Sequence, residues 1–468
     1  MNAKNNNNYR KSELKINELD VTNDCLTGRA GLSFFVAYLH GINLFPLIDQ
    51  LFGNLRKSKK GGTAVELFKQ IFCFMLDGTS RHLVYFDNLK HDKGYAACIE
   101  STENDLASSH AIKRFCKSFS FFKVFLFRRL LQKLFIWRLN ITNPAVVELG
   151  IDTMVLDNDD AECRHGVKPT YKKKKGFQPL QMNWGRYFVD AVFRGGNKHS
   201  NHGDTVQKMI THMVNRIRKE YRNDVPIIIR IDSGFFDQKI FEVCEKLGVG
   251  YICGGKMYKD IVAFAEGTTD WQRFNTPDKE DIWEYAEFGS KRDSWNMFRR
   301  ALYCRLINHG PQLRLPGTRP DTIIITNLGL GGRIDELLEQ AGQASKYLSA
   351  AAILAGYHVR GSDELANRAL KDFGHEQLPF TRFTPNAVWY YMMLVGHFLF
   401  ESFKEDAAEP AVSVAAYAST VRRRLIDIAG KIVRHGGRVV LKVALSSLNL
   451  LQLDEVFRRC ANPPVLQY

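Results

Sequence analysis

The segment VPIIIRID, at residues 225–232, is a short, β-branched apolar run of the kind that forms a buried strand. Two more segments have the same character, AVVELGID at residues 145–152 and RYFVDAVF at residues 186–193. Helical patterns lie at residues 204–221 and 238–247, and further strands are expected at residues 250–253 and 321–326. Strands that alternate with helices predict an α/β domain with a mixed sheet.

The rest of the chain divides by its residue pattern. We expect a flexible tail over residues 1–25, which carry an asparagine run, and a helical region over residues 26–140. The α/β domain would occupy residues 141–253 and 321–405, with a β-rich insertion at residues 254–320. Residues 406–468 form a basic C-terminal region with helical segments. One helix start is explicit, because Thr63 and Glu66 form a capping box, and Gly78 would end that helix.

The composition excludes a disordered or fibrous protein, because 45% of the residues are hydrophobic and 25% are charged. Lys and Arg outnumber Asp and Glu by 65 to 50, and this excess favours a polyanionic partner. Nine cysteines form no CxxC pair, so neither a disulfide framework nor a zinc ribbon is indicated. The N-terminal segment has no secretory signal, and the apolar stretch at residues 387–400 is too short to cross a bilayer. We expect a cytoplasmic protein without membrane contact.

Two acidic residues stand at the carboxyl ends of predicted strands. Asp152 ends VVELGID, and Asp232 ends PIIIRID. In α/β sheets, catalytic and binding groups gather at the carboxyl ends of strands, so the two residues are candidates for one site. A strand-terminal Asp is also a common helix N-cap or turn former, and this reading stays open for each residue taken alone.

A third carboxylate lies in the segment YHVRGSDELANRALK. On a continuous helix, five side chains of this segment share one face: Tyr357, Arg360, Glu364, Arg368 and Lys371. Such a face suits a metal ion beside a phosphate backbone. Two alternatives are a solvated helix with an Arg360–Glu364 pair, and a new helix that begins at Ser362 and leaves Tyr357 in the preceding turn.

Three carboxylates are the number needed to hold two Mg²⁺ ions, which demand hard oxygen ligands. Two ions about 4 Å apart activate the attacking oxygen and stabilise the leaving oxygen of a phosphoryl displacement. The nearby Lys and Arg side chains would hold the scissile strand. The residues therefore predict metal-dependent cleavage and transfer of phosphodiesters, with Mg²⁺ as the native metal and Mn²⁺ as a substitute.

The spacing Y-(2)-R-(3)-E-(6)-K is the signature of cut-and-paste DDE transposases from bacterial insertion sequences. Further segments occur in the same order as in the insertion sequence thirteen-eighty family: LGIDT, KGFQPL, FRGGN, RIDSGFF, YICGGK, ITNL and FTPNAVWYYMMLVGHFL. The sequence resembles this family over nearly the whole chain after the asparagine-rich tail.

The resemblance implies a DDE catalytic triad of Asp152, Asp232 and Glu364 in an RNase H-like domain that the β-rich insertion interrupts. Tyr357, Arg360 and Lys371 would then handle phosphate. The helical N-terminal region would bind terminal inverted repeats of the element and help to form a homodimer.

Two basic segments are candidates for DNA contact. In HAIKRFCKSF the predicted apolar face is Ile112, Phe115 and Phe119, and the other side carries Lys113, Arg114 and Lys117. This helix resembles the second helix of a helix-turn-helix, and an ordinary amphipathic helix is the alternative. The second segment is a lysine run that either contacts the DNA backbone near the site or forms a solvated loop: Lys172, Lys173, Lys174 and Lys175.

Relatives of this group often use an aromatic residue to stabilise a flipped base or a hairpin. The candidates are tryptophans, any of which could instead belong to the core or an interface: Trp184, Trp271, Trp283 and Trp295.

The sequence predicts a bacterial, nucleoid-associated DNA transposase that binds inverted repeats, cuts DNA by a two-metal mechanism and joins the freed 3′-hydroxyl to target DNA. The alternatives are an RNase H-like nuclease without strand transfer and a domesticated, non-catalytic DNA-binding protein. An RNA-binding protein is less favoured, because neither an RNP1-type strand nor a KH loop is present.

Overall fold

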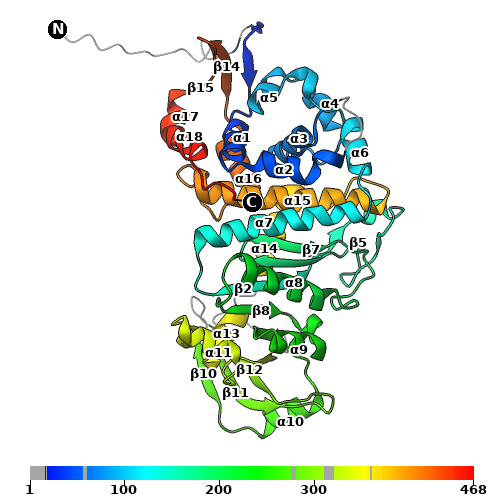
Figure 1. Cartoon of the computed structure of the whole chain (residues 1–468), viewed down its shortest axis with the longest axis vertical. Coiled ribbons are helices and arrows are strands. Elements are labelled where there is room, and N and C mark those ends of the chain that lie inside the picture. The colour runs from blue at the N-terminus through cyan, green and yellow to red at the C-terminus, as the bar shows by residue number, and fades with distance from the viewer. Residues whose placement is uncertain are drawn as a thin grey trace, which may run out of the picture.

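The computed structural model describes residues 16, 18–55, 61–275, 281–309, 321–358 and 361–467. It shows a mixed α/β protein built in layers (Figure 1). A helical layer lies at one end, two long helices, α7 (Phe125–Thr142) and α15 (Phe383–Phe403), cross the middle, and a sheet with its helices fills the other end. Most of the expected tail, residues 1–15 and 17, lies outside the described residues.

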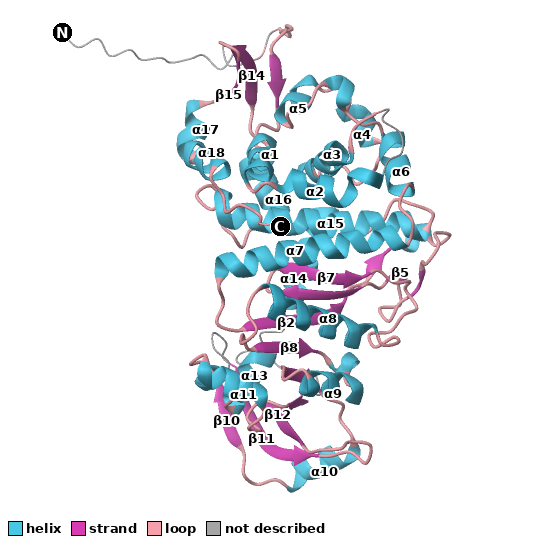
Figure 2. Cartoon of the chain, in the orientation of Figure 1, coloured by secondary structure: helices cyan, strands magenta, loops and turns pink. Residues whose placement is uncertain are grey.

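A nine-stranded mixed sheet forms the centre of the α/β part (Figure 2). The pairs β2–β8 and β8–β9 are parallel, and the other pairs are antiparallel. In spatial order its strands are β10 (Gln272–Asn275), β11 (Asp281–Ser290), β12 (Arg299–His309), β13 (Thr322–Thr326), β9 (Gly250–Gly254), β8 (Ile227–Ile231), β2 (Val147–Thr153), β6 (Leu180–Trp184) and β7 (Tyr187–Val192). The strands predicted from the sequence therefore form within two residues of the expected bounds.

The central strands are mostly apolar because helices cover both faces of the sheet. Along β8, Ile227, Ile229 and Ile231 pack into one hydrophobic cluster, whereas Ile228 packs into the other. The first cluster includes residues of α8 (Thr205–Glu220) and α9 (Gln238–Lys246), and the second includes residues of α11 (Arg333–Gln340) and α13 (Ala350–His358). Alternate side chains of one strand are thus buried on opposite sides.

Within the stretch 254–320, the described residues 254–275 and 281–309 continue the central sheet, and the rest of the expected insertion lies outside the described residues. After α10 (Lys259–Gly267), the strands β10, β11 and β12 follow one another antiparallel, and β12 pairs with β13. Within the described residues, these strands join the large sheet through ordinary ladder hydrogen bonds. A smaller sheet of three short strands, β3 (Leu156–Asp157), β5 (Lys175–Phe177) and β4 (Lys168–Pro169), lies beyond β2 in the chain.

The helical layer forms where apolar residues recur at helical spacing. Thr63 caps α3 by accepting a hydrogen bond from the Glu66 N–H at 3.1 Å, and Gly78 ends the helix in a left-handed conformation. The helices before α7 are α1 (Leu32–Gly41), α2 (Leu44–Phe52), α3 (Ala64–Asp77), α4 (Tyr85–Leu89), α5 (Lys93–Cys98) and α6 (Ser109–Lys117). Short 3-10 turns are η1 (Gly53–Leu55), η2 (Glu103–Asp105), η3 (Phe122–Val124), η4 (Asp159–Ala161) and η5 (Ser233–Phe235).

The C-terminal region folds back onto the helical layer. Its strands β14 (Gly430–His435) and β15 (Arg438–Val443) form a hairpin, and β14 also pairs with β1 (Cys25–Thr27). The remaining elements are α12 (Ala344–Tyr347), α14 (Gly361–Gly374), the π-helical turns η6 (Lys404–Ala408) and η7 (Arg422–Ile426), α16 (Ala418–Val421), α17 (Leu445–Leu450) and α18 (Leu453–Ala461).

The helix α15 is the central element of the core. Every residue from Pro385 to Phe403 is buried, which is why its sequence is apolar on all sides. In the described part of the chain, no single helix is long and apolar enough to span a membrane. One pair of helices bent by 73°, at residues 32–41 and 44–55, passes the same test by length and composition only.

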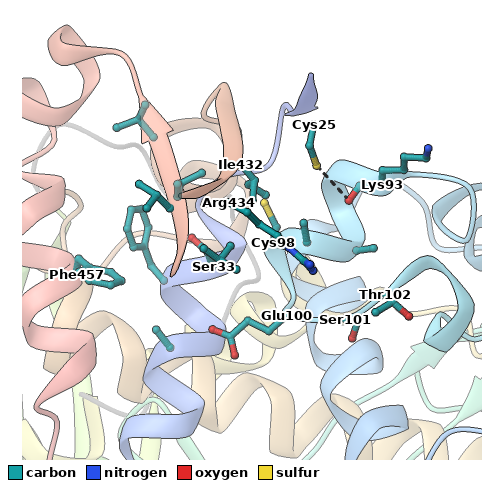
Figure 3. Close-up of a pocket in the computed structure, with 18 of the residues that line it drawn as sticks. Cys25, Ser33, Lys93, Cys98, Glu100, Ser101, Thr102, Ile432, Arg434 and Phe457 are labelled. Carbon is teal, nitrogen blue, oxygen red and sulfur yellow. Dashed lines mark hydrogen bonds between the residues drawn. The ribbon is translucent and has the colours of Figure 1, made fainter. Parts of the chain in front are cut away.

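A cavity of about 1110 Å³ opens between the helical layer and the C-terminal hairpin (Figure 3). Its lining is mostly apolar and includes Phe34 of α1, Ala96 of α5, Val440 of β15 and Phe457 of α18. It contains none of the residues predicted to carry chemistry.

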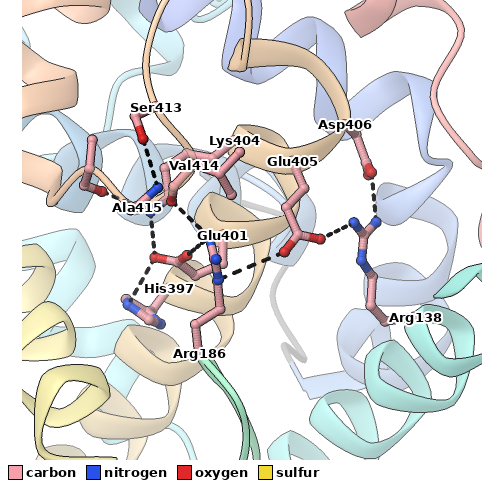
Figure 4. A network of polar contacts seen from close by, with 11 residues as sticks. Arg138, Arg186, His397, Glu401, Lys404, Glu405, Asp406, Ser413, Val414 and Ala415 are labelled. Carbon is pink, nitrogen blue, oxygen red and sulfur yellow. Dashed lines mark hydrogen bonds and ion pairs between the residues drawn. The ribbon is translucent and has the colours of Figure 1, made fainter. Parts of the chain in front are cut away.

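A buried network of charges joins the helical layer to the sheet (Figure 4). Arg138 of α7 donates to Asp406 of η6 at 2.7 Å and also to Glu405. Tyr38 of α1 donates to the other carboxylate oxygen of Asp406 at 2.6 Å. Because a buried charge without a partner is costly, the network fixes α1, α7 and the end of α15 relative to one another.

His397 of α15 lies beside this network and is fully buried. Its ring lies against Phe188 and Phe373, and Glu401 Oε1 is 3.5 Å from Nε2. Burial, with the positive charges of Lys404 and Arg186, lowers the pKa of His397 from 6.5 to about 3.

We predict that mild acid destabilises the protein through His397. The unfolded imidazole takes up a proton below pH 6.5, whereas the folded one stays neutral down to about pH 3. The contribution to stability is therefore complete above pH 6.5 and is lost as the pH falls, by about 1.4 kcal/mol per pH unit. Urea unfolding between about pH 7.5 and about pH 5.5 measures this slope.

His397→Leu should flatten the slope in that window, and the exposed His435→Gln should leave it as in the wild type. An unchanged slope in His397→Leu would show that other groups cause the acid sensitivity.

Candidate active site

The parallel pairing of β2 and β8 brings Asp152 and Asp232 together. Ile151 is paired with Ile231, so the next residue on each strand is an aspartate at the carboxyl end of the sheet. Neighbouring strands lie about 4.8 Å apart, so the two aspartates stand at adjacent strand ends.

Backbone and side-chain donors orient both carboxylates. Asp232 Oδ1 accepts the Gly234 N–H at 2.8 Å and thereby caps η5. Asp152 Oδ1 accepts the N–H of Thr153 at 2.7 Å, and Asp152 Oδ2 accepts a hydrogen bond from Asn367 Nδ2 at 3.2 Å. The N-cap role that the sequence left open for Asp232 therefore coexists with a place at the strand end.

Glu364 reaches the same region from α14. The hydrogen bond between Asn367 and Asp152 brings this helix to the end of β2, and Glu364 lies on α14 one turn before Asn367. Partial burial and the negative charges of Asp152, Asp232 and Glu364 raise the pKa of Tyr171, whose side chain is largely exposed. The three carboxylates thus act on one phenol, although they are far apart in the sequence.

Tyr357, at the end of α13, lies against the neighbouring strand β9. A methyl group on Gly254 would stand 2.5 Å from the Tyr357 hydroxyl and 3.1 Å from the Ser233 nitrogen. Cys253 is paired with Ile231, which places Gly254 beside Asp232. The phenol of Tyr357 therefore lies over the backbone next to the second aspartate, where only glycine leaves room for it.

Arg422 fixes the position of α14. Its guanidinium donates to four carbonyl oxygens at 2.8–3.0 Å, at the ends of α3 and α14: Met75, Leu76, Asp372 and Phe373. One side chain thus ties the helix that carries Glu364 to the helical layer.

The remaining residues of the predicted helix face are dispersed. Lys371 pairs with Glu376 at 2.8 Å, and Arg368 is exposed on α14. Tyr357 belongs to α13 and Glu364 to α14, so the described residues place the face on two helices. Arg360 lies outside the described residues.

The lysine run lies in and before β5, with its side chains in different surroundings. Lys174 pairs with Asp159 at 2.9 Å, and Lys175 pairs with Glu162. Lys172 lies 5.8 Å from the centre of the Tyr171 ring, and Lys173 is exposed. Two of the four lysines are thus held by carboxylates that lie shortly before them in the chain.

The predicted basic helix forms as α6, with Ser108 as its N-cap. Ile112, Phe115 and Phe119 are buried as expected. The residues on its other side are Lys113, which is half-buried, and Arg114 and Lys117, which are exposed.

Two hollows lie between α6 and α14. The first, of about 290 Å³, is lined by Lys113, Arg81, His82 and Arg164, among others. The second, of about 410 Å³, shares Arg81 and reaches Lys371, and its lining also includes four carboxylates: Asp157, Asp159, Asp160 and Glu376. Positive charge is therefore concentrated in the first hollow, which would attract a phosphate backbone.

The donor set at the strand ends consists of carboxylate oxygens, the hard ligands that Mg²⁺ and Mn²⁺ prefer. As the side chains lie, no three His, Cys, Asp or Glu residues of the described chain are close enough to hold an ion. Asp152, Asp232 and Glu364 fit a divalent ion by the chemistry of their oxygen donors.

Two residues near the carboxylates were not predicted from the sequence. Asn367 could have been found, because it follows Glu364 by three positions and so lies on the same side of a helix. Tyr171 carries no signal beyond its position before the lysine run, since its nearness to the three carboxylates arises from the fold.

We predict that Gly254→Ala displaces Tyr357 and lowers the free energy of unfolding by about 1–3 kcal/mol, the usual cost of forcing an extra methyl group into a packed site. Tyr357→Phe removes the oxygen that clashes, so the double variant should be more stable than the sum of the two changes predicts. Urea unfolding of the wild type, the two single variants and the double variant measures this departure from additivity.

Gly267→Ala is the matched control, because no atom lies within 4 Å of the place that its methyl group would take. Additive effects of Gly254→Ala and Tyr357→Phe would contradict the placement of the phenol.

Comparison with known proteins gives one strong result. A family model described as "Transposase DDE domain group 1" matches residues 24–462. None of the curated proteins matches the chain. A solved structure, described as a cryo-EM structure of the piggyBac transposase synaptic complex with hairpin DNA, aligns with 80% of this chain and 82% of that chain, at 9% identity and a TM-score of 0.28. Because the family model covers nearly the whole sequence, the chain belongs to the group 1 DDE transposases.

Proposed function

We propose that this transposase cuts and joins DNA at the site formed by Asp152, Asp232 and Glu364. The observation that carries the proposal is the register of β2 and β8, which sets the two aspartates side by side. The contact between Asn367 and Asp152 brings α14, and with it Glu364, to the same place. The family membership supplies the reaction class, transposition by a DDE enzyme.

The chain's own groups would hold and orient the reacting DNA. Asp152, Asp232 and Glu364 would hold two divalent ions, Mg²⁺ or, as a substitute, Mn²⁺, which when bound activate the attacking oxygen and stabilise the leaving one. The hydrogen bonds from Gly234 and Asn367 orient the carboxylates beforehand. Tyr357 lies beside Asp232, where its hydroxyl would contact the scissile phosphate.

The cations that line the first hollow, Lys113, Arg81 and Arg164, support binding of double-stranded DNA. We propose that the helical layer binds the terminal inverted repeats of a bacterial insertion sequence of the thirteen-eighty family, and that a homodimer pairs two ends before joining them to target DNA. The α/β part would be an RNase H-like domain. The protein would work on the nucleoid in the cytoplasm.

Of the four tryptophans, Trp283 is best placed to hold an extruded base. Its ring lies 4.6 Å from that of His358, the neighbour of Tyr357. Trp295 is buried in the core, Trp184 packs on Tyr187, and the guanidinium of Arg305 covers the ring of Trp271 at 3.7 Å.

We predict that Asp152→Asn, Asp232→Asn and Glu364→Gln each lower the rate of DNA cleavage by at least about 100-fold, because each removes a negative oxygen ligand. Binding of DNA that carries the ends of the element should persist. A gel assay with end-labelled DNA measures cleavage, and insertion of a precut end into a plasmid measures strand transfer.

Asp270→Asn is the control, because this carboxylate is exposed in the loop between α10 and β10, and the variant should be fully active. Cleavage without insertion by the wild type would favour an RNase H-like nuclease. An Asp232→Asn variant equal to the wild type in every assay would favour a non-catalytic DNA-binding protein.

We predict that removing divalent metal with EDTA stops cleavage and leaves DNA binding intact, since the cations that contact the backbone are protein side chains. Added Mg²⁺ or Mn²⁺ should restore cleavage. Cleavage that continues at full rate in EDTA would contradict a metal site at the three carboxylates.

A further inference from the structure

Three phenylalanines, two of them between α6 and α7 and one at the start of α7, form an exposed aromatic patch. Phe121, Phe122 and Phe125 are 58%, 81% and 47% exposed. Their rings contact one another edge-on, with Phe121 centred 6.2 Å from Phe122 and 6.0 Å from Phe125. Adjacent exposed rings are unfavourable in water, and such a patch usually marks a surface that a partner covers.

The patch lies in a segment of one charge. Residues 106–147 contain eight Lys or Arg and no Asp or Glu. Arg128 pairs with Asp190, and Arg138 pairs with Glu405 and Asp406. Within the described residues, the other six cations make no ion pair: Lys113, Arg114, Lys117, Lys123, Arg129 and Lys133.

We propose that Phe121, Phe122 and Phe125 contact the bases of bound DNA while the surrounding cations hold its phosphates. The proposal rests on the proposed function, which makes DNA the substrate. It adds contacts with bases to a region where only the cations were expected to contact DNA. DNA matches this surface, because its bases offer aromatic faces to the phenylalanine rings and its phosphates offer negative charge to the cations. Apolar wedges of this kind unstack or kink base steps, and aromatic rings stack on exposed bases.

A second copy of the chain fits this surface poorly. A two-fold dimer centred on the patch would bring the same face of each protomer together, so that the cations that flank the patch in the chain, Lys117 and Lys123, would meet their own copies. Such a like-charge contact is unfavourable, whereas the same charges release counterions when they meet DNA phosphates.

The test compares aromatic and basic variants in binding to a fluorescein-labelled, random-sequence DNA duplex at several salt concentrations. Phe122→Ala should weaken binding about tenfold and leave the salt dependence unchanged, because a ring carries no charge. Lys117→Ala with Lys123→Ala should weaken binding and make the salt dependence shallower, by about one unit of slope for each lysine. Phe298→Ala is the matched control. Phe298 is 63% exposed in the loop between β11 and β12, and the variant should bind as the wild type does.

Binding by Phe122→Ala and by the triple Phe121, Phe122 and Phe125 variant at wild-type affinity would overturn the proposal. A change from dimer to monomer in sedimentation, with DNA affinity per protomer unchanged, would also overturn it and assign the patch to contact between copies. The proposed function is tested separately by metal-dependent cleavage. A wild-type protein that cuts DNA while the aromatic variants bind normally therefore refutes only this inference.

Discussion

The parallel pairing of β2 with β8 is the constraint on which the candidate site depends. It sets Ile151 opposite Ile231 and so brings the following aspartates to neighbouring strand ends. A slip of one residue would turn every side chain of one strand to the other face. Isoleucines lie on both faces of β8, so they do not distinguish one register from the next. The buried Arg230 does, because it lies 3.5 Å from Glu148 of β2 and would turn to the other face in a slip.

The third carboxylate depends on the helical layer. Glu364 lies on α14, and Arg422 ties the end of this helix to the end of α3 through backbone carbonyls. The charges around Arg138 join α1 and α7 to the end of α15, the buried helix against which the sheet packs. The site is therefore assembled from two layers, and its geometry depends on how firmly they are held together.

The strands and the two aspartates could be predicted because a strand buried on both faces has a continuous apolar sequence, and a polar residue at its end is conspicuous. The capping box of α3 could be predicted because its hydrogen bonds are local. The pairing of β12 with β13 could not, since the apolar pattern of a strand does not identify its neighbour. The nearness of Tyr171 to the carboxylates and the ion pairs of Lys174 and Lys175 arise from loop conformation, which periodicity does not encode.

The pairing of β1 with β14 has a consequence for synthesis on the ribosome. Cys25 lies opposite Ile432, so this small sheet closes only after nearly the entire polypeptide has been made. Contacts between such distant segments form late, because a long loop must first be ordered. A nascent chain that stalls before the hairpin leaves the amino-terminal helices without the strands that cover them. Premature termination therefore yields a product that exposes apolar surface and is prone to aggregate.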